Sequence, residues 1–143
     1  MSKIFLNTDG GARGNPGPAA IGVVFYKENG EELHRHKETI GIATNNQAEY
    51  RAIIKALEIV ARSKWHGESQ NQEEIICRLD SQLVVEQING NYKVKNSDIK
   101  LYMVKIAGLL KILDRPVTFV HVPREKNKTA DYLVNKALDE VEK

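Results

Sequence analysis

The chain has 143 residues, of which 41% are hydrophobic and 28% are charged, and its formal net charge is +2 at pH 7. This length allows one domain with its own core, and no apolar run approaches the roughly 18 residues of a membrane-spanning helix. The single cysteine, Cys77, excludes an intramolecular disulfide and lies in an apolar run typical of a buried strand. With no signal-peptide pattern at the N-terminus, we expect a cytoplasmic protein with no membrane partner.

The first part of the chain predicts three strands. Apolar residues indicate strands over residues 3–9, 19–28 and 31–43. The pair Asn29-Gly30 between the second and third strands predicts a hairpin turn, because both residue types tolerate positive φ. The Gly- and Pro-rich stretch 10–18 is expected to be an irregular loop. His34 and His36 share one facing of the third strand, and an exposed edge-strand face is favoured over a metal site because no third ligand lies nearby.

The rest of the chain alternates helices with two further strands. Apolar residues at helical spacing predict helices over residues 48–60, 83–88, 99–113 and 130–141. Strands are expected over 74–80 and 116–122. The stretch 44–49 offers N-cap residues for the first helix, and Asp98 is placed to cap the third. The polar stretch 63–73 predicts a loop, with Trp65 covering the end of the first helix.

This order of elements predicts an α/β fold. Three strands in an antiparallel meander, followed by two strands reached through right-handed crossovers, give a five-stranded mixed sheet flanked by helices. Residues 1–143 show no repeat, low-complexity tract or linker, so we expect a single domain. Ligands of such sheets bind beyond the carboxyl ends of the parallel strands, near the point where the winding changes direction. Asp9 and Asp80 lie at two of these strand ends.

Four acidic residues stand out by their positions in these elements. Asp9 and Asp80 end strands, and Glu49 and Asp131 fall near the starts of helices. Each alone has an ordinary explanation, such as a surface acid that favours a helix N-terminus. Together, carboxylates without a thiol or imidazole set suit hard cations such as Mg²⁺ or Mn²⁺. Four acids exceed what one Mg²⁺ takes from protein and indicate two ions about 4 Å apart, as in phosphodiester hydrolysis.

The sequence around these acids resembles the successive motifs of type 1 ribonuclease H. The matching stretches are Thr8-Asp9-Gly10-Gly11, Gly14-Asn15-Pro16-Gly17-Pro18, Thr44-Asn45-Asn46-Gln47-Ala48-Glu49, Asp80-Ser81-Gln82-Leu83-Val84 and Asn127-Lys128-Thr129-Ala130-Asp131. They follow the family's order and spacing over nearly the whole chain. The Gly-rich stretch lacks the patterns of nucleotide-binding loops. Asp-Glu-Asp-Asp exonucleases order their acids similarly but begin with Asp-x-Glu, where this chain has Gly11.

The resemblance implies a ribonuclease H-like fold and a nuclease that cleaves the RNA strand of an RNA/DNA hybrid, leaving 5′-phosphate and 3′-hydroxyl ends. Catalysis would use two metal ions, Mg²⁺ with Mn²⁺ as a possible substitute. Asp9 would bridge both ions, and Asp131 would help hold the ion that activates water. Glu49 and Asp80 would hold the ion on the leaving-oxygen side.

The same resemblance assigns substrate contacts. Asn15, Asn45 and Asn46 would contact 2′-hydroxyls of the RNA strand, the groups that distinguish RNA from DNA. Helix capping is an alternative role for the latter two. The further implied contacts are Gly10 and Gly11, which leave room for the ribose, Thr44, which would contact a DNA-strand phosphate, and Asn127 in the last motif.

Two departures from the family pattern affect these expectations. Many relatives carry a histidine in a loop before the last acid; here that loop is Val122-Pro123-Arg124-Glu125-Lys126. His121 lies within the strand, so we expect Arg124 to be a partial electrostatic substitute that takes part in catalysis.

Relatives often have a basic, Trp-containing protrusion after the short helix, where this chain has only residues 91–96. Tyr92, Lys93 and Lys95 could still contact phosphate, although a solvated connector is an alternative. With no separate hybrid-binding domain, we expect a monomer of modest, salt-dependent affinity. The shortened region also suggests a relaxed nuclease that cuts double-stranded RNA. A non-catalytic RNA/DNA-binding module fits less well, because four carboxylates repel phosphate unless metal is bound.

Overall fold

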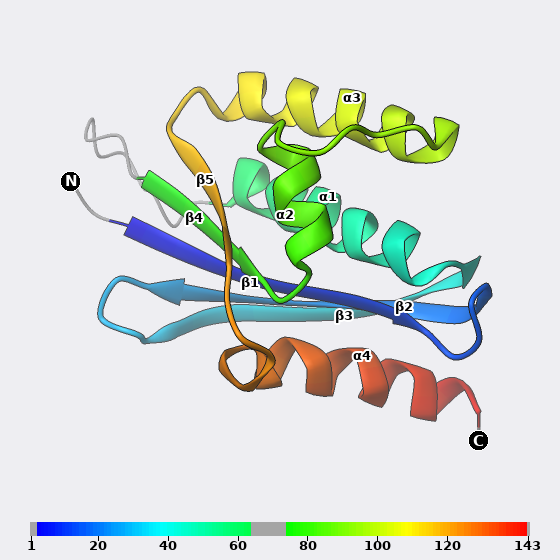
Figure 1. Ribbon diagram of the computed structural model, residues 1–143. Coiled ribbons are helices and arrows are strands. Elements are labelled where there is room, and N and C mark those ends of the chain that lie inside the picture. Colours follow the sequence, from blue (N-terminus) through cyan, green and yellow to red (C-terminus); the bar gives the residue numbers. More distant parts are fainter. Residues whose placement is uncertain (1–2, 64–73, 143) are drawn as a thin grey trace.

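A five-stranded mixed sheet forms the centre of the protein, in the order β3-β2-β1-β4-β5 (Figure 1). The computed structural model describes residues 3–63 and 74–142. The strands are β1 (Lys3–Ala12), β2 (Gly17–Lys27), β3 (Glu32–Ala43), β4 (Glu74–Leu79) and β5 (Val117–His121). The first three are antiparallel, whereas β4 pairs in parallel with both β1 and β5. The predicted fold class is confirmed.

Helices cover both faces of this sheet (Figure 1). They are α1 (Asn45–Arg62), α2 (Gln82–Ile88), α3 (Ser97–Leu113) and α4 (Lys128–Val141), with a short 3₁₀ helix, η1 (Arg124–Lys126), before the last. On one face α1 packs against β1 and β2 and carries α3, while α4 packs against β2, β3 and β1 on the other. None of the described helices combines the length and apolar character needed to cross a membrane.

The main core lies between the sheet and α1. Alternate side chains of β1, Ile4 and Leu6, point toward it, and Tyr50, Ile53 and Leu57 of α1 are completely buried against the sheet. This burial explains the helical spacing of apolar residues in the sequence, because one stripe of α1 must face the sheet. Cys77 of β4 is buried and unpaired, as expected.

The Gly-rich stretch corrects one sequence-based expectation. Instead of an irregular loop over 10–18, β1 continues through Ala12 and β2 begins at Gly17, with Gly10 paired to Ile21. Only residues 13–16 connect the two strands. Glycine and proline indicated a loop by composition, but here Gly10 serves the close approach of a helix to the strand, as described below.

The turns and caps predicted at the ends of helices and strands are confirmed in part. The hairpin at Asn29-Gly30 is confirmed; only Gly30 of the pair has positive φ, and Asn29 accepts a hydrogen bond from the Glu31 amide. Asn96, not Asp98, caps α3, because its side chain accepts from the Ile99 amide. The predicted loop 63–73, including Trp65, lies outside the described residues except for Ser63.

The two histidines lie as expected on β3, an edge strand. His34 is exposed, and the half-buried His36 has its Nε2 2.8 Å from Glu38 Oε1. Within the described ranges, neither histidine belongs to a group of side chains that could hold a metal ion.

Candidate active site

Three acids from three different elements meet at one edge of the sheet. Asp9 lies in β1, Glu49 in α1, and Asp80 directly follows β4. One carboxylate oxygen from each lies within 4.8 Å of the others. Asp9 and Glu49 are only 8% and 7% exposed, so these carboxylates are largely withdrawn from water. The sequence predicted all three, but placed Glu49 in a position typical of a surface residue.

The missing side chain of Gly10 makes this meeting possible. A Cβ atom built there would lie 2.3 Å from the backbone carbon of Ala48, closer than any real contact. Because glycine permits this approach, the start of α1 rests directly on β1, and the Gly10 amide donates a 2.8 Å hydrogen bond to Glu49 Oε1. Gly11 is less constrained, since its Cβ would meet Val134 at an ordinary 3.6 Å.

Burial, together with the neighbouring negative charges, raises the pKa values of these carboxylates. Burial, followed by the charges of Asp80 and Asp131, raises the pKa of Asp9 to about 7, although hydrogen bonding with Glu49 opposes the shift. Burial and the adjacent Asp9 raise the pKa of Glu49 well above its usual range. Burial also raises the pKa of Asp80, against the lowering effect of the Arg124 charge.

The cluster has the properties of a cation site. Glu49 Oε2 is buried and has no hydrogen-bond partner in the described part of the chain. No basic side chain forms an ion pair with Asp9, Glu49 or Asp80 among those residues. Carboxylate oxygens without protein donors are the ligands that Mg²⁺ and Mn²⁺ prefer, so the residues fit a divalent metal.

Asp131 lines the same cleft as Asp9 and Asp80. The cleft, of about 400 Å³, is lined by Asp9, Gly10, Gly11, Ala12, Arg13, Asn45, Asp80, Arg124, Asp131, Val134, Asn135 and Leu138. Asp131 is in the first turn of α4 and is not one of the three acids that lie within 4.8 Å. Arg124 Nη2 lies 3.9 Å from Asp131 Oδ1, and its side chain is 81% exposed. Two residues of opposite charge, Arg124 and Asp131, therefore act on Asp80.

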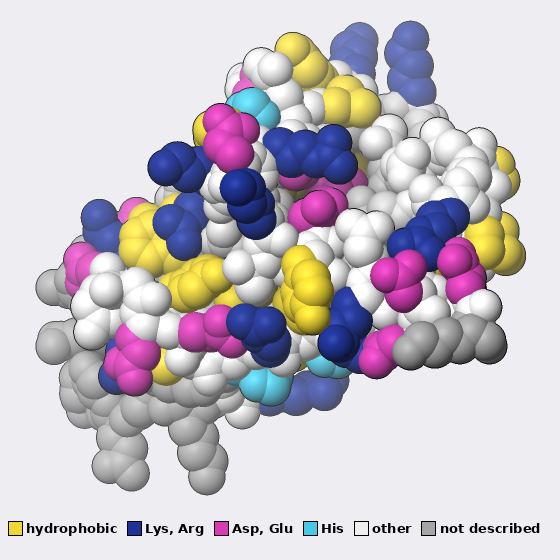
Figure 2. Space-filling model, turned by 90° about the horizontal axis from the view of Figure 1, so that it is seen from below, with side chains coloured by type: hydrophobic (Ala, Val, Ile, Leu, Met, Phe, Trp, Pro, Cys, Tyr) yellow, Lys and Arg dark blue, Asp and Glu magenta, His cyan; other side chains and the backbone are white. Residues whose placement is uncertain are grey.

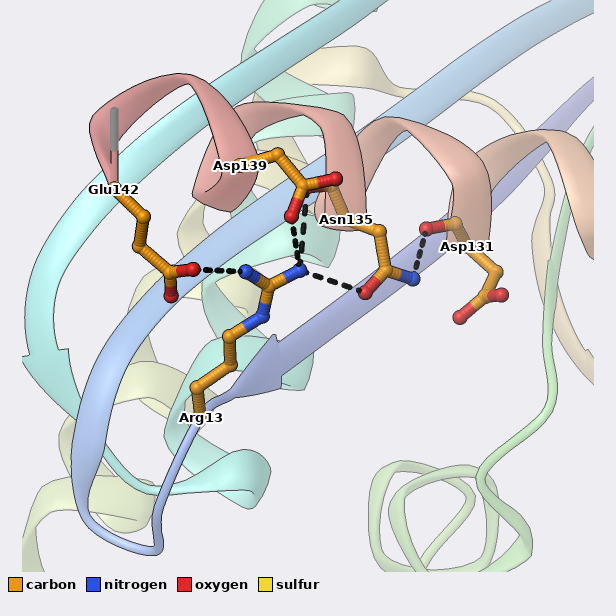
Figure 3. A network of polar contacts seen from close by, with 5 residues as sticks. All are labelled: Arg13, Asp131, Asn135, Asp139 and Glu142. Atoms are coloured by element: carbon orange, nitrogen blue, oxygen red, sulfur yellow. Dashed lines mark hydrogen bonds and ion pairs between the residues drawn. The ribbon is translucent and has the colours of Figure 1, made fainter.

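The far wall of the cleft contains an arginine that sequence reasoning missed. Arg13, in the β1–β2 connection, forms 2.8 Å ion pairs with Asp139 and Glu142 of α4 (Figure 3). It also donates to the side chain of Asn135, whose amide donates to the Asp131 carbonyl. This network attaches the β1–β2 connection to α4. The partners of Arg13 lie about 130 residues downstream, so local sequence patterns could not predict these ion pairs. The one available signal was a charged residue within a Gly-rich stretch.

The predicted RNA-contacting residues lie together in a neighbouring groove. Asn15, Thr44, Asn45 and Asn46 line a pocket of about 480 Å³, together with Gln47, Gln87, Val94, Asn96 and Ile99. Asn45 lines both this groove and the cleft, so the two adjoin. The sequence reasoning did not predict a site role for Gln87, which accepts a 2.8 Å hydrogen bond from the Tyr50 hydroxyl.

Hydrogen bonds fix the geometry of this groove. Thr44 caps α1 through a reciprocal capping box with Gln47, so neither asparagine is the N-cap. Asn45 Oδ1 accepts from the Ala12 amide, and the Asn45 amide donates to Asn15 Oδ1. The ends of β1, β2 and α1 are thereby connected, and the asparagine side chains face a common surface.

Asn127 is one of the expected substrate contacts. It is 1% exposed, and its side-chain amide donates a 2.9 Å hydrogen bond to the Thr8 carbonyl. The side chain is buried in this structure, and the expected substrate contact stays a prediction. Asn127 positions the strand residue that precedes Asp9.

The residues expected to contact phosphate in the connector between α2 and α3 lie outside the cleft and the groove. Tyr92 is 48% exposed, and Lys93 and Lys95 are exposed. They do not line the cleft or the groove, whereas Val94 and Asn96 of the same connector line the groove.

Sequence comparison agrees with this arrangement of fold and acids. Residues 7–137 match the reverse transcriptase-like family. Ribonuclease HI of Halobacterium salinarum is 42% identical over 138 residues, covering 96% of this chain and 65% of that protein. The bifunctional protein Rv2228c of Mycobacterium tuberculosis is 41% identical over 139 residues, covering 96% of this chain and 36% of that protein. The chain thus spans about a third to two thirds of the length of these relatives.

Solved structures give the same result. LC11-RNase H1, isolated from compost by a metagenomic approach, is 48% identical and superposes with a TM-score of 0.91, with complete coverage of both chains. The same enzyme in complex with an RNA/DNA hybrid is 47% identical with a TM-score of 0.89 and covers 99% of this chain and 100% of that chain. Fold and acids therefore define a protein of the reverse transcriptase-like class. Within that class, the chain belongs to the type 1 ribonuclease H family.

Proposed function

We propose that this protein is an endoribonuclease that hydrolyses the RNA strand of RNA/DNA hybrids. The carrying observation is the cluster of Asp9, Glu49 and Asp80, with oxygens within 4.8 Å of one another and the buried Glu49 Oε2 unpartnered. A fold does not require such repulsion between carboxylates, and a bound cation relieves it. The hybrid complex of LC11-RNase H1 supports the substrate class.

The four acids would hold two Mg²⁺ ions, with Mn²⁺ as a substitute. Asp9 interacts with Glu49, Asp80 and Asp131 and would be the shared ligand, with Glu49 and Asp80 holding one ion and Asp131 helping to hold the other. Such ions lower the pKa of a bound water and offset charge on the phosphate, so the products would carry 5′-phosphate and 3′-hydroxyl ends. Arg124, whose charge already acts on Asp80, would add a positive charge at the mouth of the cleft.

The groove would contact the sugar-phosphate backbone of the hybrid. Its amide side chains, from Asn15, Asn45 and Asn46, offer donors and acceptors suited to 2′-hydroxyls across a minor groove. Thr44 would reach a phosphate of the DNA strand, and Tyr92, Lys93 and Lys95 would add long-range attraction. Residues 1–143 would form one catalytic domain that acts as a monomer in the cytoplasm. The single buried cysteine, Cys77, would remain reduced there.

A cleavage assay tests this function. The parent and Asp9→Asn are incubated with end-labelled RNA/DNA hybrid, double-stranded RNA and double-stranded DNA, each with Mg²⁺, Mn²⁺ or chelator. We expect internal cutting of the hybrid's RNA strand only with metal, and at least a ~1,000-fold loss in Asp9→Asn, which removes the shared ligand. Circular dichroism of both proteins verifies the fold.

The remaining outcomes separate the alternatives. Metal-dependent cutting of double-stranded RNA would identify a relaxed nuclease, whereas hybrid binding without cutting would identify a non-catalytic module. Cutting by Asp9→Asn at the parent's rate would contradict the metal assignment.

A further inference from the structure

A second pocket lies on the face of the sheet that α4 packs against, outside the cleft and the groove. It has a volume of about 550 Å³ and is lined by Phe5, Asn7, Tyr26, Lys27, Glu28, Gly30, Arg78, Val122 and Lys126. The helix α4 runs under the other half of the sheet and leaves this half uncovered (Figure 1). Viewed from that side, hydrophobic side chains lie there between basic and acidic ones (left of Figure 2).

Strand register brings the pocket's planar side chains together. Phe5 of β1 and Tyr26 of β2 are cross-strand partners, and Arg78 of β4 is aligned with Asn7 of β1. The Arg78 guanidinium lies over the Phe5 ring, 4.3 Å from its centroid, and 5.9 Å from that of Tyr26. Three neighbouring strands therefore present one cation beside two aromatic rings.

Arg78 is a half-buried cation without an acidic partner. Its Nε donates a 2.7 Å hydrogen bond to Asn7 Oδ1, a neutral acceptor. Within residues 3–63 and 74–142, no carboxylate pairs with it and no acceptor bonds to its two Nη nitrogens. Withdrawing a cation from water without an anion is costly, and the free Nη edge matches the bidentate geometry of a phosphate.

Other charges around the pocket also favour an anion. Lys27 and Lys126 line it; Lys27 is paired with Glu31 at 3.3 Å, whereas Lys126 forms no ion pair within the described ranges. Glu28 is the one acid among the described residues that line the pocket, so positive charge prevails. Asn7 lies two residues before Asp9 on the same face of β1, which places the pocket about 7 Å from the carboxylates along the strand.

We infer that this pocket binds a nucleoside 5′-monophosphate, with the phosphate on the Nη edge of Arg78 and the base against Tyr26. A phosphate alone would use the cations but leave the aromatic lining unoccupied, whereas a base stacks on rings and on guanidinium planes. A free nucleotide and the 5′-phosphate end of a strand share this chemistry. Binding of a strand end that arises as a cleavage product depends on the proposed function, whereas binding of a free nucleotide does not.

Calorimetric titration with adenosine 5′-monophosphate tests the inference. The titration is done in chelator, where the metal-free carboxylates of the cleft repel phosphate. We expect saturable binding at one site, weakened about tenfold or more in Arg78→Gln and also weakened in Tyr26→Leu. Arg35→Gln is the matched control, because Arg35 is paired with Glu32 on β3, outside the pocket, and should bind like the parent.

Further titrations distinguish a free nucleotide from a strand end, and a second variant keeps the test valid if the first does not fold. Inorganic phosphate and adenosine should each bind at least about tenfold more weakly than the nucleotide. A 5′-phosphorylated tetraribonucleotide that binds more tightly than the mononucleotide identifies a strand end, and weaker binding identifies a free nucleotide. Lys126→Gln, an exposed position, gives a second weakened variant if Arg78→Gln does not fold.

Two results overturn the inference: no saturable nucleotide binding to the parent, or equal binding by the parent, Arg78→Gln and Lys126→Gln. Either result leaves the cleavage assay unaffected, so failure here and failure of the proposed function are distinguishable.

Discussion

Two groups of carboxylates near the cleft differ in their partners. Asp9, Glu49 and Asp80 approach within 4.8 Å of one another with no cation paired to them among the described residues. Asp139 and Glu142 of α4 each lie 2.8 Å from the same arginine, Arg13, which lines the cleft (Figure 3).

The difference separates a binding function from a structural one. The paired acids are half-exposed and satisfied by Arg13, so they attach α4 to the β1–β2 connection and need nothing further. Of the unpaired acids, Asp9 and Glu49 are buried and Asp80 is partly buried, and burial raises the pKa of Asp9 to about 7. Acidic residues alone do not indicate a metal site; buried acids without a protein cation do.

Substitution at Gly10 should disturb the unpaired group most. Gly10→Ala places a Cβ 2.3 Å from Ala48, so α1 must move away from β1 and carry Glu49 with it. We expect a loss of about 3 kcal/mol in the free energy of unfolding. Gly11→Ala, whose Cβ has room, is the matched control and should stay within about 1 kcal/mol of the parent. Urea unfolding measures both, and equal effects would refute the close-approach argument.

The unpaired group should also make stability depend on pH. Because the pKa of Asp9 is about 7 in the folded protein and ordinarily 3.8, the folded state binds more protons between these values. Without metal, the free energy of unfolding should therefore fall as pH rises from about 4 to 7, by roughly 3 kcal/mol.

Thermal unfolding in chelator measures this slope, and Mg²⁺ added at pH 8 should restore stability because it binds only the folded, deprotonated cluster. Asp9→Asn should flatten the slope and respond less to Mg²⁺. If the stability of the parent rises over the same pH interval, deprotonation of the carboxylates does not destabilise the folded state, and this prediction is wrong.

Arg124 should have a smaller effect, on rate alone. It is exposed, and its charge lowers the pKa of Asp80 against the effect of burial. Arg124→Ala should reduce hybrid cleavage by about 3- to 10-fold, which corresponds to roughly 1 kcal/mol, while Arg124→Lys keeps most of the activity. Steady-state kinetics with matched unfolding curves tests this, and unchanged kinetics in Arg124→Ala would remove Arg124 from the site.

The paired group should give the smallest effect. Arg13→Gln breaks two ion pairs whose side chains are 34% to 62% exposed, so solvent screening limits the loss to about 0.5 kcal/mol. Cleavage should stay near the parent's rate, because Asp131 keeps its place in α4. Denaturant midpoints compared with Arg35→Gln, which also breaks a surface ion pair, test this expectation. A large loss would mean that the network positions Asp131.

Much of the site was predictable because its signals are local. Strand and helix patterns placed Glu49, Asp80 and Asp131 at ends of elements, and the parallel crossover rule placed the strand ends at one edge. Asp9 was expected to end its strand, whereas β1 continues to Ala12. Other features depend on residues distant in sequence. Asn127 was expected at the substrate, yet its amide bonds to Thr8, 119 residues away. Arg13 and Arg78 likewise gained their surroundings from distant strands and helices.

The sequence by itself determined the order of elements, the mixed sheet and the identity of the acids, since hydrophobic period and motif spacing are written along the chain. Only the tertiary structure decided that residues 10–12 continue a strand, that Glu49 is buried beside Asp9, and that Asp139 and Glu142 are neutralised. The physical reason is that burial and pairing depend on which surfaces meet. The close contact of Gly10 with the backbone of α1 is one example, because it brings Glu49 beside Asp9.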